Sequence, residues 1–340
     1  MKYASLLVIA FSFLVFFSCK KESTNPTVTP LAFVKPAHFP ASNYSFVGNE
    51  VTQDKFDLGK QLFYDPILSL DNTVSCAKCH DQAHAFSDHN IKFSNGVGGT
   101  LGQRNSPALS NLAWYPNFMW DGGINHIEVF SVGPITNQLE MKETIANVVA
   151  KLNASTNYKN KFKKAYNIDV ITDQYMLKAL AQFMGMLVSS DSKYDRVYTG
   201  KTTFTASEEN GYTLFKTNCV SCHLEPLTTD FSFRNNGIDE QFTDLGRGHI
   251  TQNASDNGKF RVPNLRNIAI TYPYMHDGRF FTLAQVIDHY SNGIKQSATI
   301  DPIFQNTTGF NFSPTEKLDL IAFLKTLTDN TYLANPLYQK

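Results

Sequence analysis

The apolar residues of this chain recur mainly with the period of an α-helix. Two stretches, 145–152 and 177–188, carry apolar residues three or four positions apart. This spacing places the side chains on one face of a helix, and such a face packs against a core. We expect helices here and assign these residues no chemistry. The two stripes consist of Ile145, Val148, Val149 and Leu152, and of Leu177, Leu180, Phe183, Met184, Leu187 and Val188.

Capping boxes predict further helices in the second half of the chain. In each box, Ser or Thr stands three positions before Glu or Gln, so that side chains and backbone can exchange hydrogen bonds at a helix start. Polar residues interrupt the helical pattern over 189–203, and turn-forming residues gather at 96–99 and 234–257. Because a chain of 340 residues is long enough for two domains, we expect a domain boundary within 189–203. We expect long loops at 96–99 and 234–257. The boxes pair Thr205 with Glu208, Thr282 with Gln285, and Ser313 with Glu316.

The beginning of the chain resembles a lipoprotein signal. Its apolar run over 6–17 is too short for a comfortable membrane span and is followed by Ser18 and Cys19. We therefore expect residues 1–18 to be a signal peptide, Cys19 to carry a lipid, and residues 19–44 to form a flexible tether. A signal-anchor that keeps its helix is the alternative. The first interpretation predicts a protein that is lipid-anchored on the periplasmic side of a bacterial membrane.

The charge balance and the cysteines narrow the function. Lys plus Arg and Asp plus Glu each number 30, so no net charge points to nucleic acid as a partner. Apart from Cys19, the cysteines lie in Cys-Ala-Lys-Cys-His at 76–80 and Cys-Val-Ser-Cys-His at 219–223. This pattern is the attachment signal of c-type haem, in which the two thiols bind the porphyrin and the His binds iron. Zinc sites and redox dithiols are the alternatives, but neither explains a His directly after both pairs.

Two such motifs predict two covalently bound haems c. We expect a mainly α-helical fold with two cytochrome-c-like domains, an N-terminal domain over 45–195 and a C-terminal domain over 196–340. Each domain is expected to surround one haem, with long loops packed against it. The predicted haem-binding residues are Cys76, Cys79, His80, Cys219, Cys222 and His223.

Further motifs stand in order along the chain: Gly-Gln-Arg-Asn-Ser-Pro at 102–107, Phe-Met-Trp-Asp-Gly at 118–122, Leu-Glu-Met at 139–141, Asp-Leu-Gly-Arg at 244–247, Val-Pro-Asn-Leu-Arg-Asn at 262–267 and Tyr-Pro-Tyr-Met-His-Asp-Gly at 272–278. With them, residues 55–335 resemble the bacterial dihaem cytochrome c peroxidases and their relative MauG, which matures the quinone cofactor of methylamine dehydrogenase. The resemblance implies that the first haem reduces hydrogen peroxide and that the second haem delivers electrons from a small cytochrome c or cupredoxin. A MauG-like oxidase of a protein substrate and a pure electron-transfer cytochrome are the alternatives. A homodimer is a further expectation.

The resemblance also implies roles around the first haem. Glu140 matches the family's acid, which moves a proton between the two peroxide oxygens. A helix-end carboxylate is the alternative reading of Glu140, and Glu128 and Glu143 are nearby competitors. Phe130 replaces a Gln of many relatives and removes one polar partner from the pocket. Val97 stands where well-studied peroxidases carry a His that blocks the iron, so we expect a five-coordinate first haem.

The sequence leaves one possible ligand of each haem iron undecided. His84 or His89 could replace the missing blocking His at the first haem. At the second haem, Tyr290 stands where typical peroxidases have a Met ligand, and MauG also has Tyr there. A phenolate stabilises ferric iron and lowers its potential. Met275 and His289 are the rival ligands.

The family's interdomain features also have counterparts in this sequence. The resemblance places Trp120 in a motif that bridges the two haems, although an ordinary core Trp is the alternative. Asn105, with the backbone carbonyls of Thr271 and Pro273, matches a structural Ca²⁺ site, for which oxygen ligands are suitable. The candidates for pairing with haem propionates are Arg104, Arg247 and Arg266.

Overall fold

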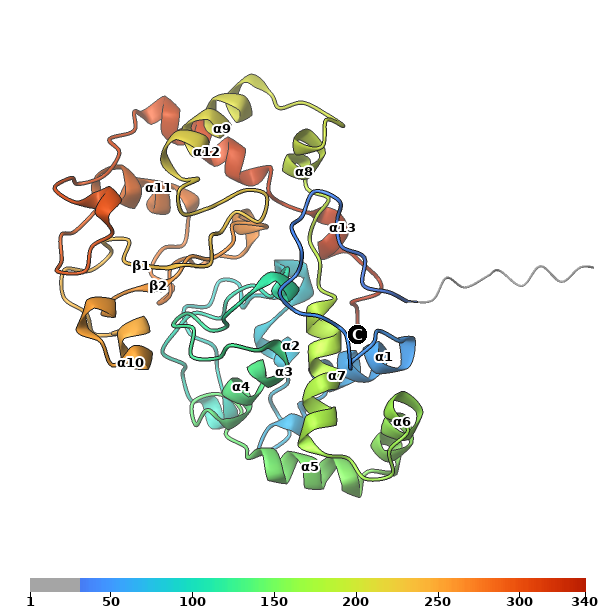
Figure 1. Ribbon diagram of the computed structural model, residues 1–340. Helices are drawn as coiled ribbons and strands as arrows, with labels where there is room; N and C mark the ends of the chain where they lie inside the picture. The colour runs from blue at the N-terminus through green and yellow to red at the C-terminus, as the bar shows by residue number, and fades with distance from the viewer. Residues whose placement is uncertain (1–30) are drawn as a thin grey trace, which may run out of the picture. The chain divides into compact units, whose positions relative to one another are not determined.

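Short helices joined by long loops make up residues 31–340, the part of the chain that the computed structural model describes (Figure 1). The first half contains α1 (Gln53–Tyr64), α2 (Cys76–Cys79), α3 (Ile127–Phe130), α4 (Val132–Thr136), α5 (Ile145–Ala154), α6 (Thr156–Tyr166) and α7 (Asp173–Gly185). The second half contains α8 (Lys193–Tyr198), α9 (Ala206–Asn218), α10 (Arg247–Thr251), α11 (Leu283–Asn292), α12 (Pro314–Lys325) and α13 (Asn330–Leu333). The strands in the described part are β1 (Phe233–Arg234) and β2 (Phe260–Arg261), which have two residues each and pair antiparallel.

The helices predicted from apolar periodicity and capping boxes are confirmed. In α5, Val148 and Leu152 are fully buried. The second predicted stripe lies in α7, except that the helix ends at Gly185, before Leu187 and Val188. The three predicted capping boxes start α9, α11 and α12, and in each the side chain and the backbone exchange both hydrogen bonds. These features depend on residues three or four positions apart, which is why the sequence alone reveals them.

The two largest hydrophobic cores of the described residues confirm the predicted pair of cytochrome-c-like domains. The first core is built on α1, α5 and α7, and the second on α9, α11 and α12. In each domain, the helix that precedes the haem motif crosses a later helix at a glycine. A side chain on Gly59 would collide with the backbone oxygen of Ala179, and one on Gly211 with that of Asp319. The chain passes from the first core to the second between Leu187 and Tyr194.

The C-terminal segment returns to the first domain. Tyr332 and Tyr338 are buried in the first core, although the residues just before them belong to the second. The Tyr332 hydroxyl donates to the carbonyl of Leu109 at 2.8 Å, and the Tyr338 hydroxyl donates to that of Met186 at 2.9 Å. Figure 1 accordingly shows the C-terminus beside α1 and α7. The last residues of the chain therefore complete the core of the first domain.

The segment from residue 31 to 44, which we expected to be part of a flexible tether, packs against the protein instead. Phe39 and Tyr44 are only 3% and 7% exposed. The indole of Trp114 donates to the carbonyl of Pro40 at 3.0 Å, and His38 lies 2.9 Å from Asp195. Burial of the aromatic side chains provides the physical reason. The polar composition of residues 31–44 therefore does not predict their packing.

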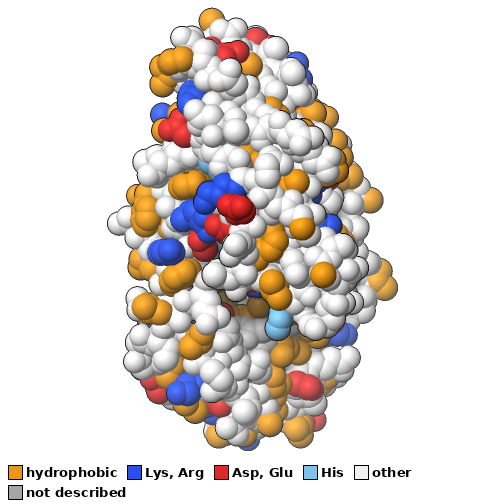
Figure 2. Space-filling model, turned by 90° about the vertical axis from the view of Figure 1, so that its left-hand side faces the viewer, with side chains coloured by type: hydrophobic (Ala, Val, Ile, Leu, Met, Phe, Trp, Pro, Cys, Tyr) orange, Lys and Arg blue, Asp and Glu red, His pale blue; other side chains and the backbone are white. Residues whose placement is uncertain are grey.

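Other expectations about the N-terminus lie outside the described residues. These are the signal peptide over 1–18, the lipid on Cys19 and the first part of the tether. Between Leu31 and Lys340, no helix has the length and apolar character needed to cross a bilayer. On the face drawn in Figure 2, basic and acidic side chains lie intermingled beside a hollow with apolar side chains in it. This mixture agrees with the balanced charge of the sequence.

Candidate haem sites

The first haem motif forms the short helix α2 and ends at His80. The Nδ1–H of His80 donates to the carbonyl of Phe86 at 2.7 Å, because a carbonyl oxygen can only accept. This bond fixes the ring and leaves Nε2 free to bind iron. Burial lowers the pKa of His80 to about 4, so the imidazole is neutral at pH 7, as a metal ligand must be.

The second motif repeats this arrangement. Nδ1 of His223 donates to the carbonyl of Thr228 at 3.0 Å, and burial lowers the pKa of His223. Interactions with the backbone of Pro107 in the first domain and of Pro263 in the second raise the pKa of the respective His and so partly oppose the effect of burial. The two domains therefore hold the imidazoles of their haem motifs in the same way.

The cysteines of both motifs fit thioether attachment. All four are free of disulfides and partly buried. Burial raises the pKa of Cys76 and of Cys219 to about 12. A redox dithiol instead needs a cysteine with a lowered pKa, so the surroundings disfavour that alternative.

A large cavity adjoins the second motif. It encloses about 1790 Å³ of empty space, part of it open to solvent, and Cys219, Cys222 and His223 contribute to its walls. Its lining is otherwise mostly apolar, with side chains such as Ile287 and Phe312 from the second core. A mostly apolar cavity beside a Cys-x-x-Cys-His motif is suited to a porphyrin.

An uncompensated guanidinium also points to a bound group in this cavity. Arg261, on β2, lines the cavity and is only 5% exposed, and burial lowers its pKa. Among residues 31–340, no partner accepts from its buried Nη1, although its Cζ lies 4.5 Å from the ring centroid of Tyr115. A buried charge needs a counter-charge, which a haem propionate would supply. The sequence alone does not reveal Arg261, because nothing local distinguishes it from a surface arginine.

The arginines that we predicted for the propionates have partners within the protein. Arg104 binds Asp244 through two hydrogen bonds and Asp121 through a third. Arg247 donates to the backbone carbonyls of Asp121 and the following glycine. Arg266 binds Asp195 through bonds of 2.7 and 2.8 Å in a fully buried pair. The hydrogen bonds of these three arginines connect elements of the first domain with elements of the second.

Tyr290 and Met275 both face the second haem cavity. The side-chain amide of Asn236 lies 3.2 Å from the Tyr290 hydroxyl and 3.5 Å from the Met275 sulfur. Burial raises the pKa of Tyr290 to about 12, and the nearby thiols of the second motif add to this rise. His289 is placed differently, because its Nε2 is bonded to the backbone carbonyl of Asn236 at 3.0 Å. The geometry therefore favours Tyr290 or Met275 over His289 as a ligand.

Glu140 and the glycine loop meet beside the first haem motif. The backbone N–H of Val97, in the 3₁₀ turn η3 (Val97–Gly99), donates to the carbonyl of Glu140 at 2.8 Å. Burial raises the pKa of Glu140, while a hydrogen bond of 2.7 Å from Asn137 to its Oε1 opposes this rise. The charge of Glu140 in turn raises the pKa of both Cys76 and Cys79, so the carboxyl lies near this motif.

The competitors of Glu140 are engaged elsewhere. Glu128 accepts a hydrogen bond of 2.8 Å from Tyr44, and Glu143 forms an ion pair of 2.7 Å with Lys151. Phe130 stacks on another aromatic ring with centroids 5.0 Å apart. Glu140 is therefore the carboxyl that the geometry favours.

His84 and His89 lie together in the segment after the first motif. Their rings stack, and Nδ1 of His84 is 2.7 Å from Oδ2 of Asp81. The ring of His89 lies against Tyr272 of the second domain, with centroids 6.1 Å apart. These contacts of both imidazole rings are therefore with residues other than Val97 and Glu140, which lie beside the first haem motif.

The predicted bridge and calcium residues meet at the boundary between the domains. The indole of Trp120 donates to the backbone carbonyl of Asn105 at 2.8 Å. Trp120 and Asn105 come from the first domain, and Thr271 and Pro273 from the second, yet all four line the same cavity. The Asn105 amide donates at 3.2 Å to the carbonyl of Ile91. Their roles stay predictions.

Two Cys-x-x-Cys-His motifs with neutral imidazoles, each in its own helical domain, define this protein as a dihaem c-type cytochrome. Known proteins agree. Residues 53–203 match the family model "Di-haem cytochrome c peroxidase", and residues 208–328 match "Cytochrome c".

The chain belongs to the family of dihaem cytochrome c peroxidases and MauG. It is 34% identical to methylamine utilization protein MauG of Methylophilus methylotrophus over 302 residues, 87% of each chain. It is 36% identical to cytochrome c551 peroxidase of Nitrosomonas europaea over 282 residues, 81% of this chain and 80% of that one. The crystal structure of a MauG-like protein associated with microbial copper homeostasis matches with a TM-score of 0.81 and 31% identity, covering 91% of this chain and 99% of that chain.

Proposed function

We propose that this protein reduces hydrogen peroxide at its first haem with electrons that enter through the second haem. One hydrogen peroxide, two electrons and two protons give two water molecules. The observation that carries the proposal is the half-buried carboxyl of Glu140 beside the first haem motif, with Val97 in the adjoining loop. A pure electron carrier gains nothing from an acid and an unblocked iron. The peroxidase relative from Nitrosomonas europaea supports the same activity.

Glu140 would act as the proton carrier of the reaction. Asn137 holds its Oε1, which leaves Oε2 free to accept a proton from one peroxide oxygen and return it to the departing oxygen. The haem, when bound, supplies the redox chemistry at iron.

Val97 would leave the first haem ready for peroxide. An apolar side chain cannot bind iron, so no ligand has to leave before peroxide enters. A resting-state electron paramagnetic resonance spectrum with one high-spin and one low-spin ferric signal is the expected result. Two low-spin signals would contradict it and would bring back His84 or His89 as ligand.

The second haem would deliver the electrons. Tyr290 is our proposed distal ligand, in place of Met275, and Trp120 lines the second haem's cavity from the first domain. A small cytochrome c or a cupredoxin would be the donor. We further propose Ca²⁺ at Asn105, Thr271 and Pro273, a lipid on Cys19 and a periplasmic location.

A MauG-like oxidation of a protein substrate is the second candidate function. It is favoured by Tyr290 and Val97 together and by the 34% identity to MauG. The two functions differ in their electron source. Steady peroxide turnover with a reduced small cytochrome c supports the peroxidase, whereas peroxide consumption that oxidises a partner protein without added donor supports the oxidase.

The substitution Glu140→Gln tests the proposed chemistry. We expect turnover to fall on the order of 10²-fold or more, the scale for a positioned acid–base group, because the amide cannot accept the proton. Glu128→Gln is the matched control and should keep its turnover. A pyridine haemochrome assay should find two haems in both variants. Near wild-type turnover in Glu140→Gln would show that Glu140 is only a structural carboxyl.

A further inference from the structure

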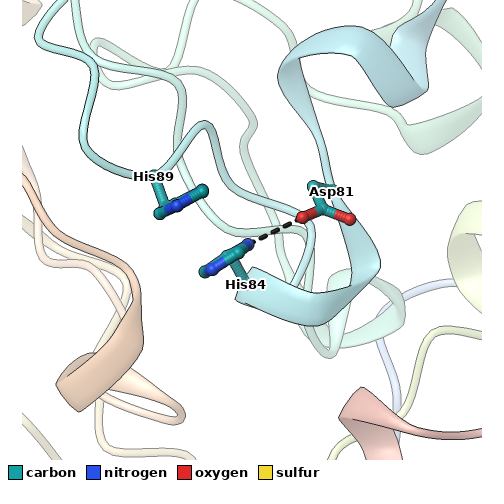
Figure 3. A group of neighbouring side chains, drawn as sticks. All are labelled: Asp81, His84 and His89. Atoms are coloured by element: carbon teal, nitrogen blue, oxygen red, sulfur yellow. Dashed lines mark hydrogen bonds and ion pairs between the residues drawn. The ribbon is translucent and has the colours of Figure 1, made fainter.

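His84 and His89 have no part in the proposed peroxide chemistry, yet they form a compact cluster with Asp81 (Figure 3). Each side chain offers one ligand atom, and these atoms all lie within 4.8 Å of one another. Nδ1 of His84 is 2.7 Å from Oδ2 of Asp81, and the two rings stack with centroids 3.3 Å apart. We propose that Asp81, His84 and His89 bind a divalent transition metal ion, with Zn²⁺ as the representative ion.

The donor set determines which ions fit. Two imidazoles and one carboxylate suit Zn²⁺ and its neighbours Cu²⁺ and Ni²⁺. Hard ions such as Mg²⁺ and Ca²⁺ prefer oxygen ligands throughout and are disfavoured by two nitrogens. Three protein ligands also leave one position of a tetrahedral ion for water.

The local backbone holds the three residues close together. Asp81 and Ser87 face each other in a short antiparallel bridge, and the N–H of Phe86 donates to the carbonyl of Asp81 at 2.7 Å. At the other end, the N–H of Asn90 donates to the carbonyl of Tyr272 at 2.9 Å. Asp81 is exposed and both histidines are half-buried, so an ion can enter from solvent.

Binding requires one ring to turn. A metal ion lies in the plane of each imidazole that binds it, whereas the planes of His84 and His89 are 5° from parallel and stacked. Rotation of His89 about its Cβ–Cγ bond would break the stack and let one of its nitrogens face an ion held by Asp81 and His84. This torsion has a broad energy profile in His, so the rotation costs little.

An ion at this position would act on the first haem through the backbone. The loop that carries Asp81 and His84 also carries the carbonyl of Phe86, which accepts the hydrogen bond from Nδ1 of His80. Fixing the loop would fix this acceptor and thereby the donor strength of the axial imidazole. This consequence rests on haem ligation by His80 and not on peroxidase activity.

Zn²⁺ titration of the haem-loaded protein tests the site. After removal of metals with a chelator, we expect isothermal titration calorimetry to detect one site that excess Mg²⁺ does not block. His84→Ala and His89→Ala should each weaken Zn²⁺ binding by at least about tenfold, since even an outer-shell partner of a metal ligand contributes that much. His249→Ala removes an exposed histidine of α10 and serves as the matched control with unchanged affinity.

Resonance Raman spectra of the reduced protein provide a second measurement. Zn²⁺ should shift the iron–histidine vibration of the first haem in the wild type but not in His84→Ala or His89→Ala. Haem content measured for each variant confirms that it is folded and loaded. If these variants bind Zn²⁺ as tightly as the wild type, the site is overturned, while the Glu140→Gln result is unaffected. An unchanged vibration on Zn²⁺ binding overturns the link to the haem.

Discussion

At the scale of single residues, burial decides which protonation state each functional group takes. It keeps His80 neutral and able to bind iron, raises the pKa of Glu140, and leaves the guanidinium of Arg261 in need of an anion. The residue types are visible in the sequence, but their electrostatics arise from neighbours that folding brings close.

The pH dependence of peroxide turnover should report the pKa of Glu140. The carboxylate must be ionised to accept the peroxide proton, so turnover should fall as the pH drops through this pKa. The hydrogen bond from Asn137 stabilises the ionised form and lowers the pKa. Asn137→Ala should therefore raise the pKa and move the acidic limb of the pH–rate profile to higher pH.

The matched control for that variant is Asn147→Ala. Asn147 donates the same kind of bond, at 3.2 Å, to Glu143, which has no proposed role in the reaction. The acidic limb of the pH–rate profile of Asn147→Ala should stay at the wild-type pH. Equal shifts in both variants would show that the limb reports something other than Glu140.

The potential of the second haem should depend on Arg261. Arg261→Gln leaves the proposed propionate partner without a counter-charge, and the added negative field stabilises ferric iron. We expect the potential in spectroelectrochemical titration to fall by on the order of tens of millivolts. Lys259→Gln removes a charge that is already paired with Asp256 and should change the potential less. Equal effects would argue against contact between Arg261 and the haem.

At the scale of elements, each domain depends on one close helix crossing. Gly59 in α1 and Gly211 in α9 let their helices contact the backbone of α7 and α12, respectively. The same device in both domains indicates that each haem motif is positioned by the helix just before it. The glycines are needed for close approach and not for an unusual backbone conformation.

Alanine at either crossing should destabilise the protein. The new Cβ of Gly59→Ala or Gly211→Ala would meet backbone atoms, which cannot rotate away. We expect the free energy of unfolding in urea to fall by about 1–3 kcal/mol, the usual cost of overpacking. Gly102→Ala is the control, because its Cβ would have no neighbour nearer than 3.7 Å. An equal fall in the free energy of unfolding for Gly102→Ala would show that the helix crossings are no more sensitive than other glycine positions.

At the scale of the whole described chain, the segment around His38 and the C-terminal segment connect the two domains. The segment around His38 pairs with Asp195, which in turn binds Arg266 of the second domain. The C-terminal residues Tyr332 and Tyr338 complete the first core. Stability of the first domain should therefore depend on residues at the far end of the sequence.

Tyr332→Ala tests this dependence. Removing a fully buried aromatic ring and its bond to the carbonyl of Leu109 should cost about 3–5 kcal/mol. Hydrogen exchange should show the loss of protection in α1 and α7, with α9 and α12 less affected. Tyr198→Ala, at a side chain that is 46% exposed, should have little effect. Loss of protection centred on α9 and α12 would contradict the proposed role of the tail.

The sequence by itself determined the features that depend on near neighbours along the chain. The helical stripes, the three capping boxes and both haem motifs involve residues within a few positions of one another. The mainly helical, two-domain architecture followed from them. The choice of Glu140 came from the family's motif order, since nothing local distinguishes it from Glu128 or Glu143.

Only the tertiary structure decided which residues meet across long separations. It placed Val97 against Glu140, left the buried Arg261 without an anion among the described residues, and gathered His84 and His89 beside Asp81. It also packed residues 31–44 and the C-terminal tail onto the first core. Contacts of this kind leave no periodic trace in the sequence, because they depend on how helices and loops pack in three dimensions.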